Sequence, residues 1–244
     1  MKICAAQTKP IKGNIQANIE NHLLFIDRAL SNGAEAIIFS ELSLTGYEPT
    51  LAKDLATNAN DNRLSIFQEI SDQTGITIGV GLPTINGSGF SISMILFRPN
   101  KPSLVYSKKY LHPDEDEFFI PGKNIPIVIV NDTTIGIAIC YELSVPEHSN
   151  VAHNSGAEIY IASVAKFAKG VENAMITLSD IAIKYSMPAM MVNAIGPADN
   201  GICTGNSSVW DSTGQLIGQL DNSRVGLLTY DTKSGGVVCL YYEK

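Results

Sequence analysis

Apolar residues recur along this chain with two different spacings, and segments of the two kinds alternate. In residues 14–32 they return every three or four positions, which predicts an amphipathic helix, and Gly33 suits the end of that helix. Residues 34–40 follow as a short apolar run with β-branched residues, which predicts a buried strand. On the same grounds, further helices are predicted over residues 62–74, from Pro146 to about Gly156, and over 171–186.

The remaining apolar segments are short and predict strands, some of them joined by tight turns. The stretch Asn86–Gly89 is a strong hairpin signal, and Asn131-Asp132 joins a second pair of strands. The predicted strands cover residues 3–7, 76–85, 91–99, 103–109, 125–130, 134–140, 157–165, 188–196, 207–212, 215–220, 224–230 and 237–242. Because hairpins alternate with helix-bearing connections, we expect mixed sheets. Because the central strands are apolar on both faces, we expect helices to cover them.

Composition narrows the class of protein. A chain of 244 residues with 45% apolar content can bury a sizeable core, and no linker or repeat divides it, so residues 1–244 are expected to form one domain. The net charge of −7 disfavours a nucleic-acid partner, and no apolar run is long enough for a membrane span. The amino-terminal residues lack the apolar core of a signal peptide. The four cysteines are far apart, which predicts reduced thiols and a cytoplasmic protein; they are Cys4, Cys140, Cys203 and Cys239.

Polar groups of complementary chemistry end three of the apolar strands. Glu41 follows the strand at 34–40, Lys108 ends the strand at 103–109, and Cys140 ends the strand at 134–140. Ligand sites of open α/β sheets form outside the carboxyl ends of strands, so the three side chains are candidates for one site. Taken singly, each has a plainer interpretation: a turn carboxylate, a surface charge and a core thiol. A cysteine–histidine dyad also stays open, with four candidate partners at His22, His112, His148 and His153.

The three strand ends lie in longer segments that resemble the motifs of one enzyme family. The segments read FSELSLTGY, YSKKYL and GIAICYELSVPE, and their order and local sequence resemble the nitrilase superfamily of carbon–nitrogen hydrolases. Further resemblances, which extend over nearly the whole chain, are CAAQTKPIKGNIQANIE, FFIPG, VNAIG and TGNSSVWDSTGQLI. This resemblance implies an α/β fold, a four-layer α-β-β-α sandwich with two mixed β-sheets covered by helices. It also implies a homodimer.

The resemblance assigns a role to each strand-end residue. By position, Glu41 corresponds to the general base, Lys108 to the catalytic lysine and Cys140 to the nucleophile. The implied reaction is hydrolysis of a small amide to a carboxylate and ammonia or an amine through a cysteine thioester, without a metal or an organic cofactor. The residue types suit this chemistry, because a thiol needs a base to take its proton and a cation to stabilise the oxyanion.

Two further assignments depend on register. The family reads Tyr-x-Lys-x-His-Leu, which selects Lys108 over Lys109, although Tyr110 stands where the histidine is usual. Many family members place a second site glutamate six residues before the proline that is Pro121 here. That position is Glu115, with Glu117 as the competitor.

The substrate is less well defined by the resemblance. The segment 162–170 is expected to line the pocket, with Lys166 either anchoring a substrate carboxylate or lying in solvent. An N-carbamoyl amidohydrolase is disfavoured by Ser144, where such enzymes often carry an arginine. Acyl transfer on the same scaffold, a cysteine–histidine hydrolase and a binding module with a vestigial site are the remaining alternatives. The residues expected to contact the substrate are Tyr47, Tyr141, Glu142, Ser163, Lys166 and Asn193.

Overall fold

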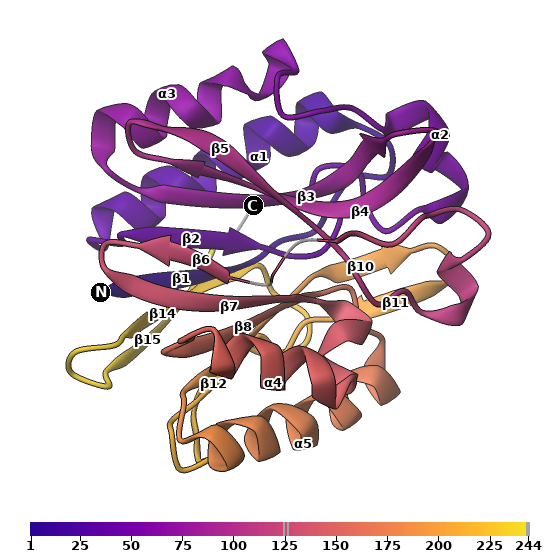
Figure 1. Ribbon diagram of the computed structural model, residues 1–244. Helices are drawn as coiled ribbons and strands as arrows, with labels where there is room; N and C mark the ends of the chain where they lie inside the picture. The colour runs from indigo at the N-terminus through magenta and orange to yellow at the C-terminus, as the bar shows by residue number, and fades with distance from the viewer. Residues whose placement is uncertain (124, 126, 243–244) are drawn as a thin grey trace.

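The computed structural model describes residues 1–123, 125 and 127–242 of the chain. Two mixed β-sheets lie face to face, and helices cover the outer face of each (Figure 1). The first sheet has seven strands in the order β15-β14-β1-β2-β3-β4-β5, and the second has six in the order β13-β12-β9-β8-β7-β6. The four-layer α-β-β-α sandwich expected from the sequence is confirmed.

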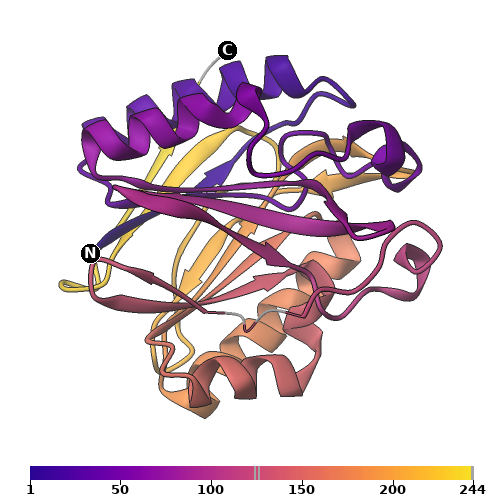
Figure 2. The ribbon, with the colours of Figure 1, turned by 45° about the horizontal axis from the view of Figure 1, so that its top comes forward.

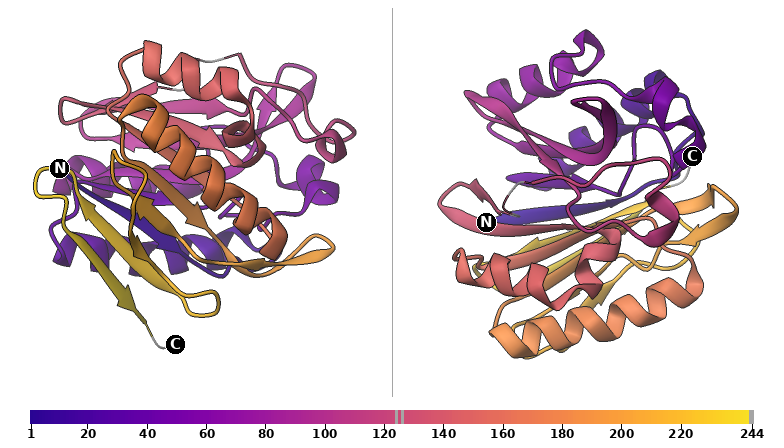
Figure 3. Two further views of the ribbon diagram at one scale, coloured as in Figure 1. Left: turned by 90° about the horizontal axis from the view of Figure 1, so that it is seen from below. Right: turned by 45° about the vertical axis from the view of Figure 1, so that its right-hand side comes forward.

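Of the five α-helices in the described part of the chain, four form the outer layers. Figure 2 shows α1 and α3 together on one side of the molecule and α4 and α5 together on the opposite side. Seen from below, α5 runs across the second sheet (Figure 3). No helix in the described part of the chain is long and apolar enough to cross a bilayer. The helices are α1 (Ile15–Ser31), α2 (Ala52–Leu55), α3 (Ser65–Thr74), α4 (Pro146–Asn154) and α5 (Ala168–Tyr185).

Central strands of both sheets are parallel to their neighbours, whereas the outer strands are antiparallel. In the first sheet β2 is parallel to β1 and β3, and in the second β8 is parallel to β7 and β9. The strands of the first sheet are β1 (Lys2–Gln7), β2 (Ala36–Phe39), β3 (Thr77–Asn86), β4 (Gly89–Arg98), β5 (Lys101–Ser107), β14 (Gly226–Asp231) and β15 (Val237–Tyr241). Those of the second are β6 (Ile127–Val130), β7 (Thr133–Ile139), β8 (Ile159–Val164), β9 (Ala189–Asn193), β12 (Ser208–Trp210) and β13 (Leu216–Gln219).

Side-chain alternation along the strands explains the layers. In β2, Ala36 and Ile38 enter the core between the two sheets, whereas Ile37 and Phe39 enter the core beneath α1 and α3. In β8, Ile159 and Ile161 likewise face the other sheet. Successive side chains of a strand point to opposite faces, so a strand that is apolar at every position must be covered on both sides.

Most predicted elements are confirmed, and the differences are local. The segment predicted as one strand over 188–196 divides into β9 and β10 (Ile195–Ala198), and β10 pairs with β11 (Gly201–Thr204) in a separate two-stranded sheet. The predicted 171–186 helix begins earlier, at Ala168. Short elements were missed, namely α2 and 3₁₀ turns such as η1 (Pro49–Leu51), η3 (Pro113–Glu115) and η4 (Cys140–Ser144).

The hairpin predicted at Asn131-Asp132 is present between β6 and β7. Both turn residues have positive φ, 45° and 66°, which is the backbone of the two-residue turn whose twist matches antiparallel strands. Pro126, within the predicted strand 125–130, lies outside the described residues.

Candidate active site

Three strand ends meet where the two sheets face each other. Glu41 follows β2 and Lys108 follows β5, both in the first sheet, whereas Cys140 follows β7 in the second. The Nζ atom of Lys108 donates to Oε1 of Glu41 at 2.8 Å, and both side chains are fully buried. The fold therefore brings together the three residues that the sequence predicts.

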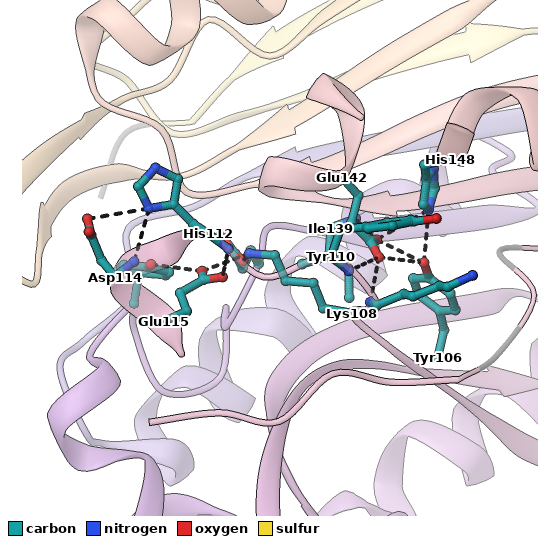
Figure 4. A network of polar contacts seen from close by, with 12 residues as sticks. Tyr106, Lys108, Tyr110, His112, Asp114, Glu115, Ile139, Glu142 and His148 are labelled. Carbon is teal, nitrogen blue, oxygen red and sulfur yellow. Dashed lines mark hydrogen bonds and ion pairs between the residues drawn. The ribbon is translucent and has the colours of Figure 1, made fainter. Parts of the chain in front are cut away.

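A second glutamate completes the buried charge cluster. The Lys108 ammonium donates to Oε1 of Glu115 at 2.7 Å (Figure 4). The hydroxyl of Tyr47 donates to the same oxygen at 2.9 Å. The other oxygen of Glu115 accepts the backbone N–H of His112 at 2.8 Å, which anchors it at the end of η3. Glu115 is buried and Glu117 is exposed, so the structure brings Glu115 to the lysine.

The cluster holds one ammonium between two carboxylates, and this shapes the acidity of its members. Burial raises the pKa of Glu41, and the charge of Glu115 adds to the rise against the opposing effects of Lys108 and the Cys140 thiol. Burial alone would lower the pKa of Lys108, but the surrounding acidic groups outweigh it and the pKa is raised. Oε2 of Glu41 is buried without a hydrogen-bond partner among the described residues. Glu41 thus keeps one oxygen available for a proton.

Cys140 occupies a constrained turn between β7 and η4. Its φ of 46° lies in the left-handed region, which non-glycine residues seldom adopt outside sites where the surroundings enforce it. Desolvation raises the pKa of its thiol to about 11, with Glu41 adding to the rise and the ammonium groups of Lys166 and Lys108 opposing it. At neutral pH the resting sulfur is therefore a thiol that needs a base.

Two glycines let neighbouring backbone approach the loops that carry Glu41 and Lys108. A Cβ at Gly81 of β3 would lie 2.5 Å from the Leu42 nitrogen and 2.7 Å from the Ser40 oxygen, on either side of Glu41. A Cβ at Gly122 would collide with the carbonyl of Ser107, next to Lys108. These are backbone atoms, so no side-chain rotation relieves the contact.

Cys140 opens onto a cavity of about 600 Å³. Three of the residues expected to contact the substrate line it, namely Tyr47, Tyr141 and Lys166. Other residues that line the cavity were not predicted from the sequence; they include His112, Asp114, Phe118, Asn173 and Asp199. For some of them, the run of acidic and aromatic residues after Lys108 was the available signal. The cavity provides room for a small substrate beside the sulfur.

Residues 2–238 match the family model of the carbon–nitrogen hydrolases. The chain belongs to that family. Since the match covers almost all of the chain, the family expected from the three strand-end motifs is confirmed, and the protein is a carbon–nitrogen hydrolase of the nitrilase superfamily.

Curated relatives are distant but extend along most of the chain. An (R)-stereoselective amidase from a Pseudomonas species is 25% identical over 220 residues, which are 89% of this chain and 80% of that protein. A glutamine-dependent NAD(+) synthetase of Thermotoga maritima is 22% identical over 227 residues, and the match spans 39% of its length.

Solved structures support the fold. An amidase from Nesterenkonia sp. AN1 superimposes with a TM-score of 0.86 at 24% sequence identity, over 95% of this chain and 92% of that one. A mutant of the same amidase shows Michael addition of acrylamide at its active-site cysteine.

Three residues expected to contact the substrate do not line the cavity, which corrects the prediction for Glu142, Ser163 and Asn193. All three are fully buried, and their polar atoms bond to protein groups. Ser163 in β8 donates to the carbonyl of Phe39 at 2.9 Å, and so links the second sheet to the end of β2. Asn193 accepts from the backbone N–H of Lys166 at 2.8 Å and donates to its carbonyl at 3.1 Å. Ser163 and Asn193 therefore hold the backbone next to the site and do not face the cavity.

The histidines do not favour a cysteine–histidine dyad. The ring nitrogens of His148 lie 2.9 Å from the Tyr106 hydroxyl and 2.7 Å from the Tyr160 hydroxyl. His22 bonds to Ser43 at 2.9 Å and stacks on Phe39. No hydrogen bond joins a histidine to Cys140 among the described residues, whereas the charges of Glu41 and Lys108 lie close enough to shift the pKa of its thiol.

Proposed function

We propose that this carbon–nitrogen hydrolase cleaves small amides through a thioester on Cys140. The observation that carries the proposal is the buried Glu41–Lys108–Glu115 cluster, which adjoins a thiol facing a cavity of about 600 Å³. The buried cluster supplies a base and a cation beside the thiol, as nucleophilic attack on an amide requires. The cysteine adduct in the Nesterenkonia amidase also supports it.

In the first half-reaction, Sγ of Cys140 attacks the amide carbonyl while Glu41 accepts the thiol proton. A thiol with a pKa of about 11 is almost entirely protonated at neutral pH, so proton removal must accompany attack. Burial raises the pKa of Glu41, which makes its carboxylate a stronger base than an exposed one. Lys108, together with the backbone N–H of Tyr141, stabilises the oxyanion of the tetrahedral intermediate.

Collapse of that intermediate breaks the carbon–nitrogen bond. Glu41 returns its proton to the leaving nitrogen, ammonia or an amine departs, and the acyl group remains on sulfur. In the second half-reaction Glu41 deprotonates a water molecule, which attacks the thioester. The carboxylic acid leaves and the thiol regains its proton, so the enzyme ends in its starting state.

Ammonia release across a panel of small aliphatic amides and N-carbamoyl amino acids tests this function. We expect turnover of one or more amides and none with Cys140→Ala. Mass spectrometry after iodoacetamide treatment should show that loss of activity follows labelling of Cys140 and not of Cys4, Cys203 or Cys239. Full activity in Cys140→Ala would reject the proposal, and turnover that requires an added amine acceptor, with none in water alone, would favour acyl transfer.

Lys166 favours a substrate that carries a carboxylate beyond the amide. It lines the cavity with Cys140, and Asn193 fixes its backbone from both sides. Lys166 makes no ion pair within the part of the chain the structure describes. Lys166→Met should raise KM for an ω-amide of a dicarboxylic acid by about tenfold or more, and leave KM for a neutral amide of equal length nearly unchanged. Equal effects on both amides would remove Lys166 as the anchor.

Two further parts of the proposal concern the oligomeric state and the cellular location of the protein. A homodimer is supported by Ile176 and Ile183, which are 65% and 56% exposed on α5. A cytoplasmic location is supported by the four free cysteines. Light scattering at micromolar concentration tests the first, and cell fractionation tests the second.

A further inference from the structure

The buried carboxylate of Glu142 lies at the centre of a polar network between two neighbouring loops (Figure 4). Its Oε1 accepts the backbone N–H of Lys109 at 2.6 Å, and the N–H of Tyr110 lies 3.4 Å from the same oxygen. Its Oε2 accepts the backbone N–H of Ile139 at 2.8 Å. These bonds replace the water that the carboxylate loses on burial.

Three aromatic side chains continue the network away from the carboxylate. The Tyr106 hydroxyl lies 2.9 Å and 2.8 Å from the two oxygens of Glu142, and His148 Nε2 lies 2.9 Å from that hydroxyl. Tyr106 has one proton, which it donates to the carboxylate, so its oxygen accepts the Nε2–H of His148. Nδ1 of His148 lies 2.7 Å from the Tyr160 hydroxyl, and its Nε2 also lies 3.4 Å from Oε2 of Glu142. The network therefore extends from Glu142 through Tyr106 and His148 to Tyr160.

We propose that Glu142 is a positioning residue that sets the separation of Lys108 and Cys140. Its two principal backbone donors are each one residue from a reacting group, because Lys109 follows Lys108 and Ile139 precedes Cys140. One rigid carboxylate thus joins the loop of the first sheet to the loop of the second. The inference rests on the proposed function for the roles of the lysine and the cysteine.

A carboxylate is needed because both of its oxygens must accept. In Glu142→Gln the side chain has one acceptor oxygen and one NH₂ group. Whichever way the amide turns, its NH₂ faces a backbone N–H, either that of Lys109 or that of Ile139, and one loop loses its anchor. A misplacement of about 1 Å is enough to cost on the order of 10²-fold in rate.

The test compares the full-length wild type with Glu142→Gln and Tyr106→Phe at a temperature where circular dichroism shows each to be folded. We express kcat per active site, with the number of active sites titrated by iodoacetamide. On this basis Glu142→Gln should lower kcat by about 10- to 100-fold and change KM by less than about threefold. Tyr106→Phe keeps both backbone anchors, so its loss should be smaller. Alkylation of Cys140 by iodoacetamide at pH 8 should slow by about tenfold in Glu142→Gln, because Lys108 supports the thiolate less well.

Leu143→Ala is the matched control. Leu143 is the next residue of η4 and is buried in the apolar core beneath the second sheet, so its truncation removes packing but no anchor. It should lower the melting temperature and leave kcat and the alkylation rate near wild type. Wild-type kcat and alkylation in Glu142→Gln, or the same losses in Leu143→Ala, would overturn the inference.

The role of Glu142 can still be tested if Glu142→Gln does not fold or if the wild type hydrolyses no amide. If Glu142→Gln does not fold, Tyr106→Phe is compared with Tyr160→Phe, which is three hydrogen bonds from the carboxylate. Slower alkylation in Tyr106→Phe alone supports the inference, and equal rates in the two variants overturn it. Alkylation needs no amide substrate, so it still decides the role of Glu142 if the wild type hydrolyses no amide and the proposed function fails.

Discussion

Glu41 and Glu142 are both buried carboxylates beside the Lys108 loop, yet their surroundings differ. Both oxygens of Glu142 accept backbone N–H groups, and both lie within 3 Å of a tyrosine hydroxyl. Glu41 accepts from Lys108 through one oxygen, and its other oxygen has no partner among the described residues. A carboxylate whose acceptor capacity is filled, as in Glu142, holds its hydrogen-bond partners in place. A buried carboxylate with an oxygen that lacks a hydrogen-bond partner, as in Glu41, keeps a raised pKa and can move a proton.

The largest expected effect follows from removing the under-bonded carboxylate. Glu41→Gln keeps the shape of the side chain but cannot take the thiol proton, so kcat should fall by about 10²- to 10⁴-fold. The loss should appear in kcat more than in KM, because proton transfer occurs in the transition state. Steady-state kinetics of the folded variant measure it. A value within a few-fold of wild type would mean that the base lies elsewhere.

Removing the shared cation tests the other member of the pair. Lys108→Met should lower kcat by roughly 10²- to 10³-fold, as the loss of one oxyanion donor does. The combined loss in Glu41→Gln/Lys108→Met should be smaller than the product of the single losses, because both groups act on one thiol.

Lys108→Met should also make stability depend on pH. Without the ammonium, Glu41 faces Glu115 unpaired, and the fold should lose about 3–5 kcal/mol near neutral pH. Removing the lysine raises the pKa of Glu41 further above its unfolded value, so the folded state binds the proton more tightly. The deficit should therefore grow as pH rises through the folded pKa and shrink as pH falls below it. Urea unfolding at pH 5 and pH 8 measures this difference, and an equal deficit at both values would contradict it.

The close packing of β3 against the backbone on either side of Glu41 can be disturbed without changing a polar side chain. Gly81→Ala places a methyl group against backbone atoms of residues 40 and 42, so it should cost about 3 kcal/mol and lower kcat by displacing Glu41. Gly79→Ala is the matched control in the same strand. Its methyl group would meet the flexible ends of Ile38 and Met94, so it should cost about 1 kcal/mol and preserve kcat. Thermal unfolding and kinetics of both variants measure these values, and equal kcat losses would contradict the prediction.

The smallest expected effect concerns the link between the sheets. Ser163→Ala removes the hydrogen bond to the Phe39 carbonyl and should cost about 1–2 kcal/mol, because the carbonyl is left buried. We expect kcat to change by less than about threefold, since Glu142 still joins the loops. A loss as large as that of Glu142→Gln, measured by kinetics, would show that Ser163 carries the alignment instead.

The layers and the strand ends could be predicted because the alternation of apolar and polar side chains along a short segment indicates which of its faces are buried. Ile37 and Ile38 face different cores, and a strand apolar at both positions has to be sandwiched. Glu115 also had a local signal, since the carboxylate caps the N–H of His112 three residues earlier, in the pattern of a capping box.

The roles of Glu142, Ser163 and Asn193 could not be predicted in the same way. Each lies at the carboxyl end of a strand, where both cavity-facing and inward-facing polar residues occur. Which way such a side chain points depends on turns such as η4, whose first residue has an unusual positive φ. Some of their partners are also distant in the chain: Asn193 and Lys166 are 27 positions apart, and Ser163 and Phe39 are 124 positions apart.

The division of the proposed catalytic groups between two sheets has a consequence for folding. Glu41 and Lys108 belong to the first sheet and Cys140 to the second, so neither sheet alone holds a base next to the nucleophile. A nascent or partly unfolded chain would present an unassisted thiol of ordinary reactivity. Hydrolytic activity then reports the docking of one sheet on the other, and during slow heating it should disappear when the sheets separate, even where each sheet keeps its own hydrogen bonds.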